Sequence, residues 1–370
     1  MIYHNTVPQL QAPERSLRLE DLRKVVGTDK IVDELMGDLV SNNPSLTSAS
    51  THLFSGSLTL SCDPMLQRAH CRSIIFSRGI QTIYYVSTFS GGGKYFRPTC
   101  VMLMGEACNI GHSPNSSQRE IALITELIHV ASLVHDDVLD SAATRRTLRT
   151  VNSLFNEKVA ILSGDFIIAR ATSKLARLGC TDTIRILSSV IRDLIKGEIR
   201  QLNAGASQED QFALYLDKTY LKTASLIAHG CQAVVLNSGR PHLQHTAFEY
   251  GKNLGIAFQL VDDMLDFIST SRELGKAAGS DLKLGLATAP VLYASLSHPR
   301  LLDLIARSFS RPGDVEQALE LVADSKGIER TRALAEGYAE RALRDVEKLP
   351  QCEFSEGLNS LCEIVISRTS

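Results

Sequence analysis

The chain has 370 residues and a formal net charge of −2, and 44% of its residues are apolar while 22% are charged. This composition is that of a globular protein, and the near-neutral charge argues against a nucleic-acid partner. No apolar run reaches the length of about 18 residues that a membrane-spanning helix needs, so we expect no transmembrane segment.

The first part of the chain divides into three segments with different patterns. Residues 1–16 form an N-terminal tail, and the opening residues are too acidic for a clean mitochondrial transit peptide. Residues 17–40 have the spacing of a short amphipathic helix. Residues 41–88 are largely polar, without a sustained period, which indicates an irregular or inserted segment.

From residue 89 to residue 370 the apolar residues recur at helical spacing. Long segments such as QREIALITELIHVASLVHDD and EYGKNLGIAFQLVDDMLDFI carry several turns of this pattern, and turn-forming breaks separate them. Several of these segments are apolar almost all round, which is typical of the interior of a large bundle. We therefore predict an all-α fold with one large helical bundle over residues 89–370.

The segment LVHDDVLD places three acids, Asp136, Asp137 and Asp140, inside a strongly apolar helical run. Burial strips hydration from carboxylates and makes them repel one another, so the helix needs a compensating partner there. An exposed acidic face is the alternative, but the flanking residues are too apolar for an exposed helix. Positions i and i+4 share a helix face, so Asp136 and Asp140 should project together.

A second segment, QLVDDMLDF, repeats this arrangement with Asp262, Asp263 and Asp266. Two occurrences of the same DDxxD pattern in apolar helices favour a shared cause, namely two acidic patches that face each other across one cavity. Carboxylates without Cys or His partners suit Mg²⁺, which usually keeps water ligands and is shared with substrate phosphates.

Basic residues that suit a phosphate group occur near both ends of this region. The segment GGGKYFRP carries Lys94 and then Arg97 directly before a proline, which predicts that a helix with anion-attracting free N–H groups starts at Arg97. Arg145 and Arg146 follow the first acidic motif. A glycine turn alone is weak evidence, but beside two acidic motifs it indicates a second diphosphate site.

Together, GGGKYFRP, LIHVASLVHDDVLD, RR, KTAS, FQLVDDMLD and GKAAGSDLKLG, in this order and spacing, resemble the trans-polyprenyl diphosphate synthases. The resemblance is greatest to the long-chain branch, which includes the catalytic subunits (subunit 1) of decaprenyl and solanesyl diphosphate synthases. It implies the isoprenoid synthase fold, with both acidic motifs facing a central cavity. It also implies an enzyme that adds isopentenyl diphosphate repeatedly to an allylic diphosphate such as farnesyl or geranylgeranyl diphosphate.

The resemblance also assigns roles to single residues. It implies that a Mg²⁺ cofactor is held by the outer aspartates of both motifs, and that a short set of polar residues assists the leaving group or shields the cation. The implied metal ligands are Asp136, Asp140, Asp262 and Asp266, and the implied catalytic residues are Asp136, Asp140, Asp262, Lys222, Thr223 and Gln259. Thr223 and Gln259 would equally serve as ordinary core hydrogen-bonding residues.

Substrate binding is implied at a further set of residues. Arg145 would contact the allylic diphosphate, and Lys276 would assist the leaving group or shield the cation. Isopentenyl diphosphate would be bound by Lys94, Arg97, His129 and Arg146. Without the motif, a lone histidine such as His129 on an apolar helix is usually a core residue.

Product length is argued from the helix that precedes the first acidic motif. One isoprene unit is about as long as one helical turn of about 5.4 Å, so each turn offers a side chain that stops the growing tail. Short-chain members of the family carry bulky aromatics one turn before the first aspartate, whereas this chain has Ile128, Ala131 and Ser132. We predict an open path and a product of about eight to ten isoprene units, although small residues also allow close helix packing.

The sequence departs from the family pattern at one position, and it leaves two alternative functions open. Leu286 replaces the second lysine that the family commonly has, a feature shared with the long-chain quinone-type enzymes. A class I terpene cyclase shares the fold but lacks the GGGKYFRP site. A non-catalytic or weakly active partner subunit tends to lose the aspartates, which are intact here.

By resemblance we also expect a role in ubiquinone side-chain synthesis and a mitochondrial location. The same resemblance implies a homodimer, or a heterotetramer with a divergent second subunit.

Overall fold

The computed structural model describes residues 95–109, 115–145, 148–202, 208–268 and 279–368. The expected tail, first helix and inserted segment (1–16, 17–40 and 41–88) lie outside these ranges, as do Lys94, Arg146 and Lys276.

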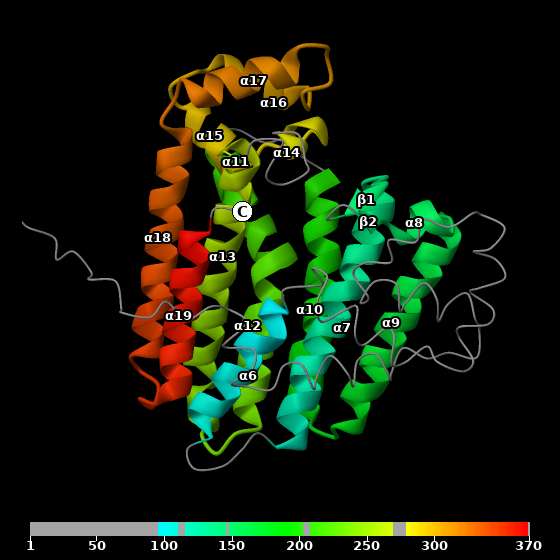
Figure 1. The fold of residues 1–370 in the computed structure, drawn as a ribbon, viewed down its shortest axis with the longest axis vertical. Coiled ribbons are helices and arrows are strands. Elements are labelled where there is room, and N and C mark those ends of the chain that lie inside the picture. Colours follow the sequence, from blue (N-terminus) through cyan, green and yellow to red (C-terminus); the bar gives the residue numbers. More distant parts are fainter. Residues whose placement is uncertain (1–94, 110–114, 146–147, 203–207, 269–278, 369–370) are drawn as a thin grey trace, which may run out of the picture.

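The described residues form an all-α bundle of long helices, as the sequence predicted (Figure 1). The first half of the bundle comprises α6 (Phe96–Cys108), α7 (Ser116–Leu139), α8 (Val151–Leu154), α9 (Glu157–Arg177), α10 (Thr181–Leu202), α11 (Gln208–Thr219), the π-helix η1 (Tyr220–Ala224) and α12 (Ser225–Leu236). A minimal antiparallel hairpin, β1 (Thr144–Arg145) and β2 (Leu148–Arg149), follows α7.

The second half begins with a 3₁₀ turn and the long helix that carries the second acidic motif. It comprises η2 (Pro241–Leu243), α13 (Gln244–Ile268), α14 (Ser280–Lys283), α15 (Ala289–Ser295), α16 (Arg300–Ala306), α17 (Asp314–Ala323), α18 (Gly327–Val346) and α19 (Glu353–Ser367). Helices α14 to α17 cover one end of the bundle, at the top of Figure 1. None of the helices in the described ranges is long and apolar enough to cross a bilayer.

Helix α6 begins one residue earlier than the proline rule predicted. Its first residue is Phe96, so Arg97 is the second helical residue and Pro98 the third. The first four backbone N–H groups of a helix have no partner within the helix, so a proline at the third position removes no hydrogen bond. Arg97 therefore still lies in the first turn.

Close backbone packing joins α13 to η1 and to the first turn of α12. A Cβ atom added to Gly255 would lie 2.6 Å from Ala224 Cα, and one added to Gly251 would lie 2.7 Å from Ala228 Cα. Only glycine permits this approach. It brings α13 directly against η1, where Lys222 and Thr223 lie.

Helices α7 and α13 run in the same direction, so their C-terminal ends lie at the same end of the bundle (Figure 1). The start of α7 is fixed by a capping box in which Asn115 and Gln118 satisfy each other's backbone N–H groups. Both helices contribute to one large apolar core, α7 through Ile121 and Leu127 and α13 through Tyr250, all fully buried. Both acidic motifs consequently occur where this core meets polar residues.

Candidate active site

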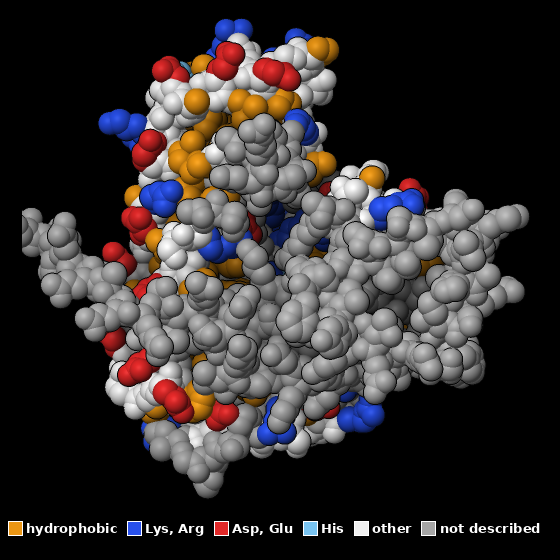
Figure 2. All heavy atoms as spheres, in the orientation of Figure 1, with side chains coloured by type: hydrophobic (Ala, Val, Ile, Leu, Met, Phe, Trp, Pro, Cys, Tyr) orange, Lys and Arg blue, Asp and Glu red, His pale blue; other side chains and the backbone are white. Residues whose placement is uncertain are grey.

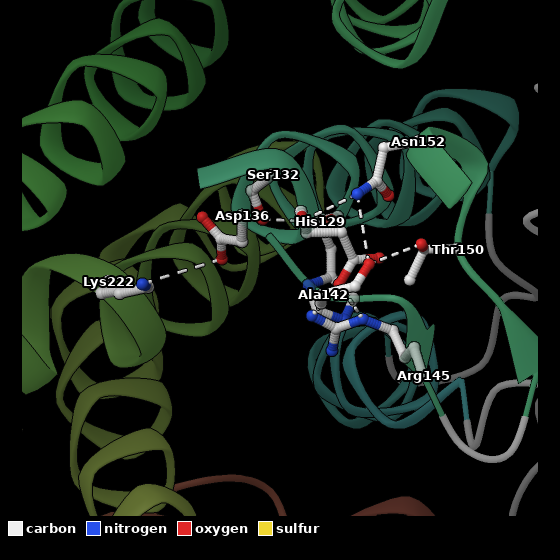
Figure 3. Close-up of polar contacts among 9 residues, drawn as sticks. His129, Ser132, Asp136, Ala142, Arg145, Thr150, Asn152 and Lys222 are labelled. Atoms are coloured by element: carbon white, nitrogen blue, oxygen red, sulfur yellow. Dashed lines mark hydrogen bonds and ion pairs between the residues drawn. The ribbon is translucent and has the colours of Figure 1, made fainter. Parts of the chain in front are cut away.

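The first aspartate of the first motif faces the π-helix. Lys222 Nζ lies 3.8 Å from a carboxylate oxygen of Asp136 and 2.6 Å from one of Glu198, a residue of α10. Figure 3 shows Asp136 and Lys222 pointing toward one another from α7 and η1. Three helices thus bring two carboxylates and one ammonium group together.

The middle aspartate of this motif has a different role. Asp137 is 3% exposed and accepts hydrogen bonds of 2.8 Å from Arg145, a residue of β1, through two guanidinium nitrogens. Asn152 donates to the backbone carbonyls of Asp137 and Ala142 (Figure 3). Asp137 therefore anchors the β-hairpin to the end of α7.

The middle aspartate of the second motif is an anchor as well. Asp263 is 3% exposed and accepts hydrogen bonds from the Tyr215 hydroxyl at 2.5 Å and from Gln259 Nε2 at 2.7 Å. Gln259 Oε1 accepts from the Thr223 hydroxyl at 2.8 Å. Adjacent residues of η1, Lys222 and Thr223, thus contact the first motif and, through Gln259, the second.

The first aspartate of the second motif contacts the C-terminal segment. Asp262 lies 2.8 Å from a guanidinium nitrogen of Arg368, which also stacks 4.5 Å above the ring of Phe258. The sequence offered no signal for this pairing, because Arg368 lies 106 positions away and outside any motif (368 − 262). An arginine therefore stands where the resemblance implied a metal ion.

The last aspartate of the second motif caps a helix. Asp266 accepts hydrogen bonds from the backbone N–H groups of Ser280 and Asp281 and from the Ser280 hydroxyl, at 2.5 to 3.1 Å. These donors begin α14, so the carboxylate satisfies N–H groups that the helix leaves free. Asp262 and Asp266 are four residues apart but contact different parts of the chain.

Burial dominates the electrostatics of the first motif. Loss of hydration raises the pKa of Asp136 to about 6, with Lys222 opposing the shift and Glu198 and Asp140 adding to it. Burial also raises the pKa of Asp140. The pKa of Lys222 is raised: burial acts to lower it, but Asp136 and Glu198 outweigh that effect. The site holds excess negative charge that a cation would stabilise.

The residues implied for isopentenyl diphosphate lie together where they are described. Arg97 donates a 2.9 Å hydrogen bond to His129 Nε2, and this joins α6 to α7. Because a guanidinium group only donates, His129 must accept through Nε2. His129 is therefore not a lone core histidine.

The implied chain-length residues lie on α7, before the first motif. Ile128 and Ala131 are fully buried in the core, and Ser132 is half-buried, with its hydroxyl donating to the backbone of His129. These positions connect the acidic end of α7 to the apolar interior.

The donor set at this end of the bundle suits Mg²⁺. The outer aspartates offer hard carboxylate oxygens, and within the described residues no three acidic, His or Cys side chains converge on one point. A metal bound here would accordingly complete its coordination with water or substrate oxygens, which Mg²⁺ tolerates well. Asp136 and Asp140 are best suited, since Asp262 pairs closely with Arg368 and Asp266 accepts three hydrogen bonds, whereas Asp136 lies 3.8 Å from its lysine.

A family model described as "Polyprenyl synthetase" matches residues 81–322. The chain belongs to the polyprenyl synthetase family. It is 50% identical over 285 residues to the human all trans-polyprenyl-diphosphate synthase PDSS1, covering 76% of this chain and 69% of that protein. It is 41% identical to the mitochondrial solanesyl-diphosphate synthase 1 of rice, covering 75% of this chain and 69% of that protein.

Solved structures of polyprenyl synthases have the same fold. A polyprenyl synthase from Caulobacter crescentus, crystallised with calcium and isoprenyl diphosphate, aligns with a TM-score of 0.79 and 27% identity over 97% of this chain and 100% of that chain. A decaprenyl diphosphate synthase from Rhodobacter capsulatus aligns with a TM-score of 0.78 and 26% identity over 95% of this chain and 100% of that chain. This family membership makes the chain a prenyltransferase with the all-α isoprenoid synthase fold.

Proposed function

We propose that this prenyltransferase of the polyprenyl synthetase family condenses isopentenyl diphosphate repeatedly onto an allylic diphosphate, and that its product supplies the side chain of ubiquinone. The observation that carries the proposal is the link between the two acidic motifs. Lys222 contacts Asp136, and its neighbour Thr223 contacts Gln259, which binds Asp263. One short π-helix therefore contacts the first motif directly and the second through Gln259.

Different residues would act on the leaving diphosphate and on the allylic cation. Breaking the allylic C–O bond leaves a diphosphate anion and an allylic cation, and Lys222 is placed beside the carboxylates to stabilise the departing charge. Mg²⁺ held by Asp136 and Asp140 would supply Lewis-acid stabilisation of that charge. Arg145 would contact the allylic diphosphate from its ion pair with Asp137. Thr223 and Gln259 would shield the cation. The alkene of isopentenyl diphosphate would attack this cation and form the new C–C bond, and the proton lost from the resulting cation would pass to the released diphosphate.

Isopentenyl diphosphate would be bound at Arg97 and His129. The hydrogen bond between them orients the guanidinium group, which matches phosphate oxygens through its fixed N–H geometry. Lys94 and Arg146, outside the described residues, would complete this site, and Lys276 would assist the leaving group.

The growing chain would pass from Asp136 along α7 into the core. Ser132, Ala131 and Ile128 carry no aromatic ring, so about eight to ten isoprene units fit by turn counting. Relatives of this chain are named as decaprenyl, solanesyl and hexaprenyl synthases, and several are named mitochondrial. We extend the mitochondrial location to this chain, together with assembly as a homodimer or as a heterotetramer with a divergent subunit.

The test is incubation of the purified chain with isopentenyl diphosphate, farnesyl diphosphate and Mg²⁺, with product lengths read by mass spectrometry. We expect products of about eight to ten units, and chelation of the metal should abolish them. Addition of a divergent second subunit separates a chain that needs a partner from a non-catalytic one. Absence of any product in both arms, or a cyclic product, contradicts the proposal.

A further inference from the structure

One helix face runs from the second acidic motif to the first. Tyr215, Lys218 and Lys222 are three and four residues apart along α11 and η1, and this spacing places them on one face. Tyr215 donates to Asp263 at one end of this face, and Lys222 contacts Asp136 and Glu198 at the other. Lys218 lies between these two contacts.

The ammonium group of Lys218 is largely buried, and no ion pair joins it to a carboxylate of the described residues. Its Nζ lies 5.8 Å from the centre of the Tyr215 ring. Among the side chains that the structure describes, no carboxylate lies within ion-pair distance of it, although Asp263, Asp281 and Glu198 are near enough to attract it. Burial outweighs that attraction and lowers the pKa of Lys218. A partly buried ammonium group of this kind is stabilised when an anion binds to it.

Three other cations around the site are already committed to carboxylates. Lys222 binds Glu198 and Asp136, Arg145 binds Asp137, and Arg368 binds Asp262. A diphosphate entering between the motifs meets their negative charge as well as these partly neutralised cations. Lys218 has no such carboxylate partner among the described side chains, so its charge is not neutralised by an ion pair there and is available to a diphosphate.

We propose that Lys218 is a catalytic residue that binds the diphosphate group between the two acidic motifs and stabilises it as it leaves. This inference deepens the proposed function and rests on it. Tyr215 sets the position of Lys218 from one side, because its hydroxyl is fixed on Asp263 and its ring lies beside the ammonium group. Lys222 lies near enough on the other side for the two positive charges to repel each other.

The experiment measures binding of inorganic pyrophosphate in saturating Mg²⁺ by isothermal titration calorimetry, on the full chain. Lys218→Met, which keeps the length of the side chain, should weaken pyrophosphate binding about tenfold to a hundredfold, as expected for a charge-assisted hydrogen bond. Lys218→Arg should recover most of the loss. Lys252→Met is the matched control, because Lys252 pairs with Glu249 on α13, away from the motifs, and should bind as the native chain does.

Thermal unfolding of each variant excludes a folding defect, and Lys218→Gln replaces Lys218→Met if the latter does not fold. Pyrophosphate binding by folded Lys218→Met or Lys218→Gln that equals that of the native chain overturns the inference. Equal losses in Lys218→Arg and Lys218→Met also overturn it, because the charge is then not what acts. A native chain that binds pyrophosphate through Lys218 but makes no prenyl product would contradict the proposed function instead.

Discussion

The two acidic motifs share one sequence pattern but have different surroundings. In both, the middle aspartate is buried and serves as an anchor, Asp137 for the β-hairpin and Asp263 for Tyr215 and Gln259. The outer aspartates differ. Asp136 faces a lysine that it shares with Glu198, whereas Asp262 pairs with Arg368.

The last aspartates complete this contrast. Asp140 ends α7 half-buried, while the carboxylate of Asp266 accepts three hydrogen bonds at the start of α14. The outer aspartates of the second motif are therefore held by close protein partners, whereas those of the first motif are better placed for the cation that we propose. A repeated motif consequently does not imply a repeated environment.

The largest expected effect separates the two motifs by activity. Asp136→Asn removes one of the two carboxylates that we propose as metal ligands, so turnover should fall on the order of 10³-fold. Asp266→Asn should lower turnover only about tenfold, because it disturbs α14 rather than the first metal site. Steady-state kinetics measures both. If both variants lost the same turnover with unchanged melting temperatures, the two motifs would not differ in this way and Asp266 would act as a metal ligand.

The next effect tests the shared anchoring role of the middle aspartates. Asp137→Ala leaves Arg145 without its partner, and Asp263→Ala leaves Tyr215 and Gln259 without theirs. Each should lower the free energy of unfolding by about 2 kcal/mol, measured by urea denaturation. Asp140→Ala is the matched control and should change it by less than about 0.5 kcal/mol. A control as destabilised as the two anchors would contradict this assignment.

A smaller effect concerns the ion pair at the second motif. Arg368→Ala removes a cation that competes with metal at Asp262. A partly exposed pair of this kind is worth at most about 1 kcal/mol, so Mn²⁺ affinity should rise about fivefold. Electron paramagnetic resonance titration of Mn²⁺ measures this without turnover. Weaker Mn²⁺ binding would show that Arg368 organises the site instead of competing for it.

The smallest effect is a pH dependence of stability. Burial raises the pKa of Asp263 to about 6, above its ordinary value, so the folded chain keeps this proton longer than the unfolded chain does. Its contribution to stability is complete below about pH 4 and is lost as pH rises through 6. In metal-free protein, Asp263→Asn should therefore lower the free energy of unfolding less at pH 7.5 than at pH 4. Urea denaturation at both pH values measures this. The opposite slope would contradict the burial of this carboxylate.

Local patterns predicted the helices well because the apolar spacing and the core agree. The turn-forming breaks LGCTD (178–182), NSGRPH (237–242) and SFSRPGD (308–314) each begin after one helix has ended and reach into the start of the next. The shared face of Asp136 and Asp140 was also predictable from spacing alone.

Contacts between distant segments were not predictable in the same way. The carboxylate of Asp266 lies at the start of α14 because the backbone N–H groups of Ser280 and Asp281 donate to it there. The apolar spacing of α13 does not predict this contact. The partners Glu198, Tyr215 and Arg368 likewise come from elements far away in the chain. The π-helix was missed too, since the residues YLKTA have ordinary helix propensities.

The π-helix also restricts the length of the segment that contains it. An α-helix advances 100° per residue, so deletion of one residue within Tyr220–Ala224 would rotate α11 by about that angle relative to α12. Even if the deleted residue is not Lys222, the Tyr215 hydroxyl would no longer reach the carboxylate of Asp263. A substitution in this stretch changes the contacts of one side chain, whereas an insertion or deletion displaces all of α11 at once, so the length of the segment is as constrained as its chemistry.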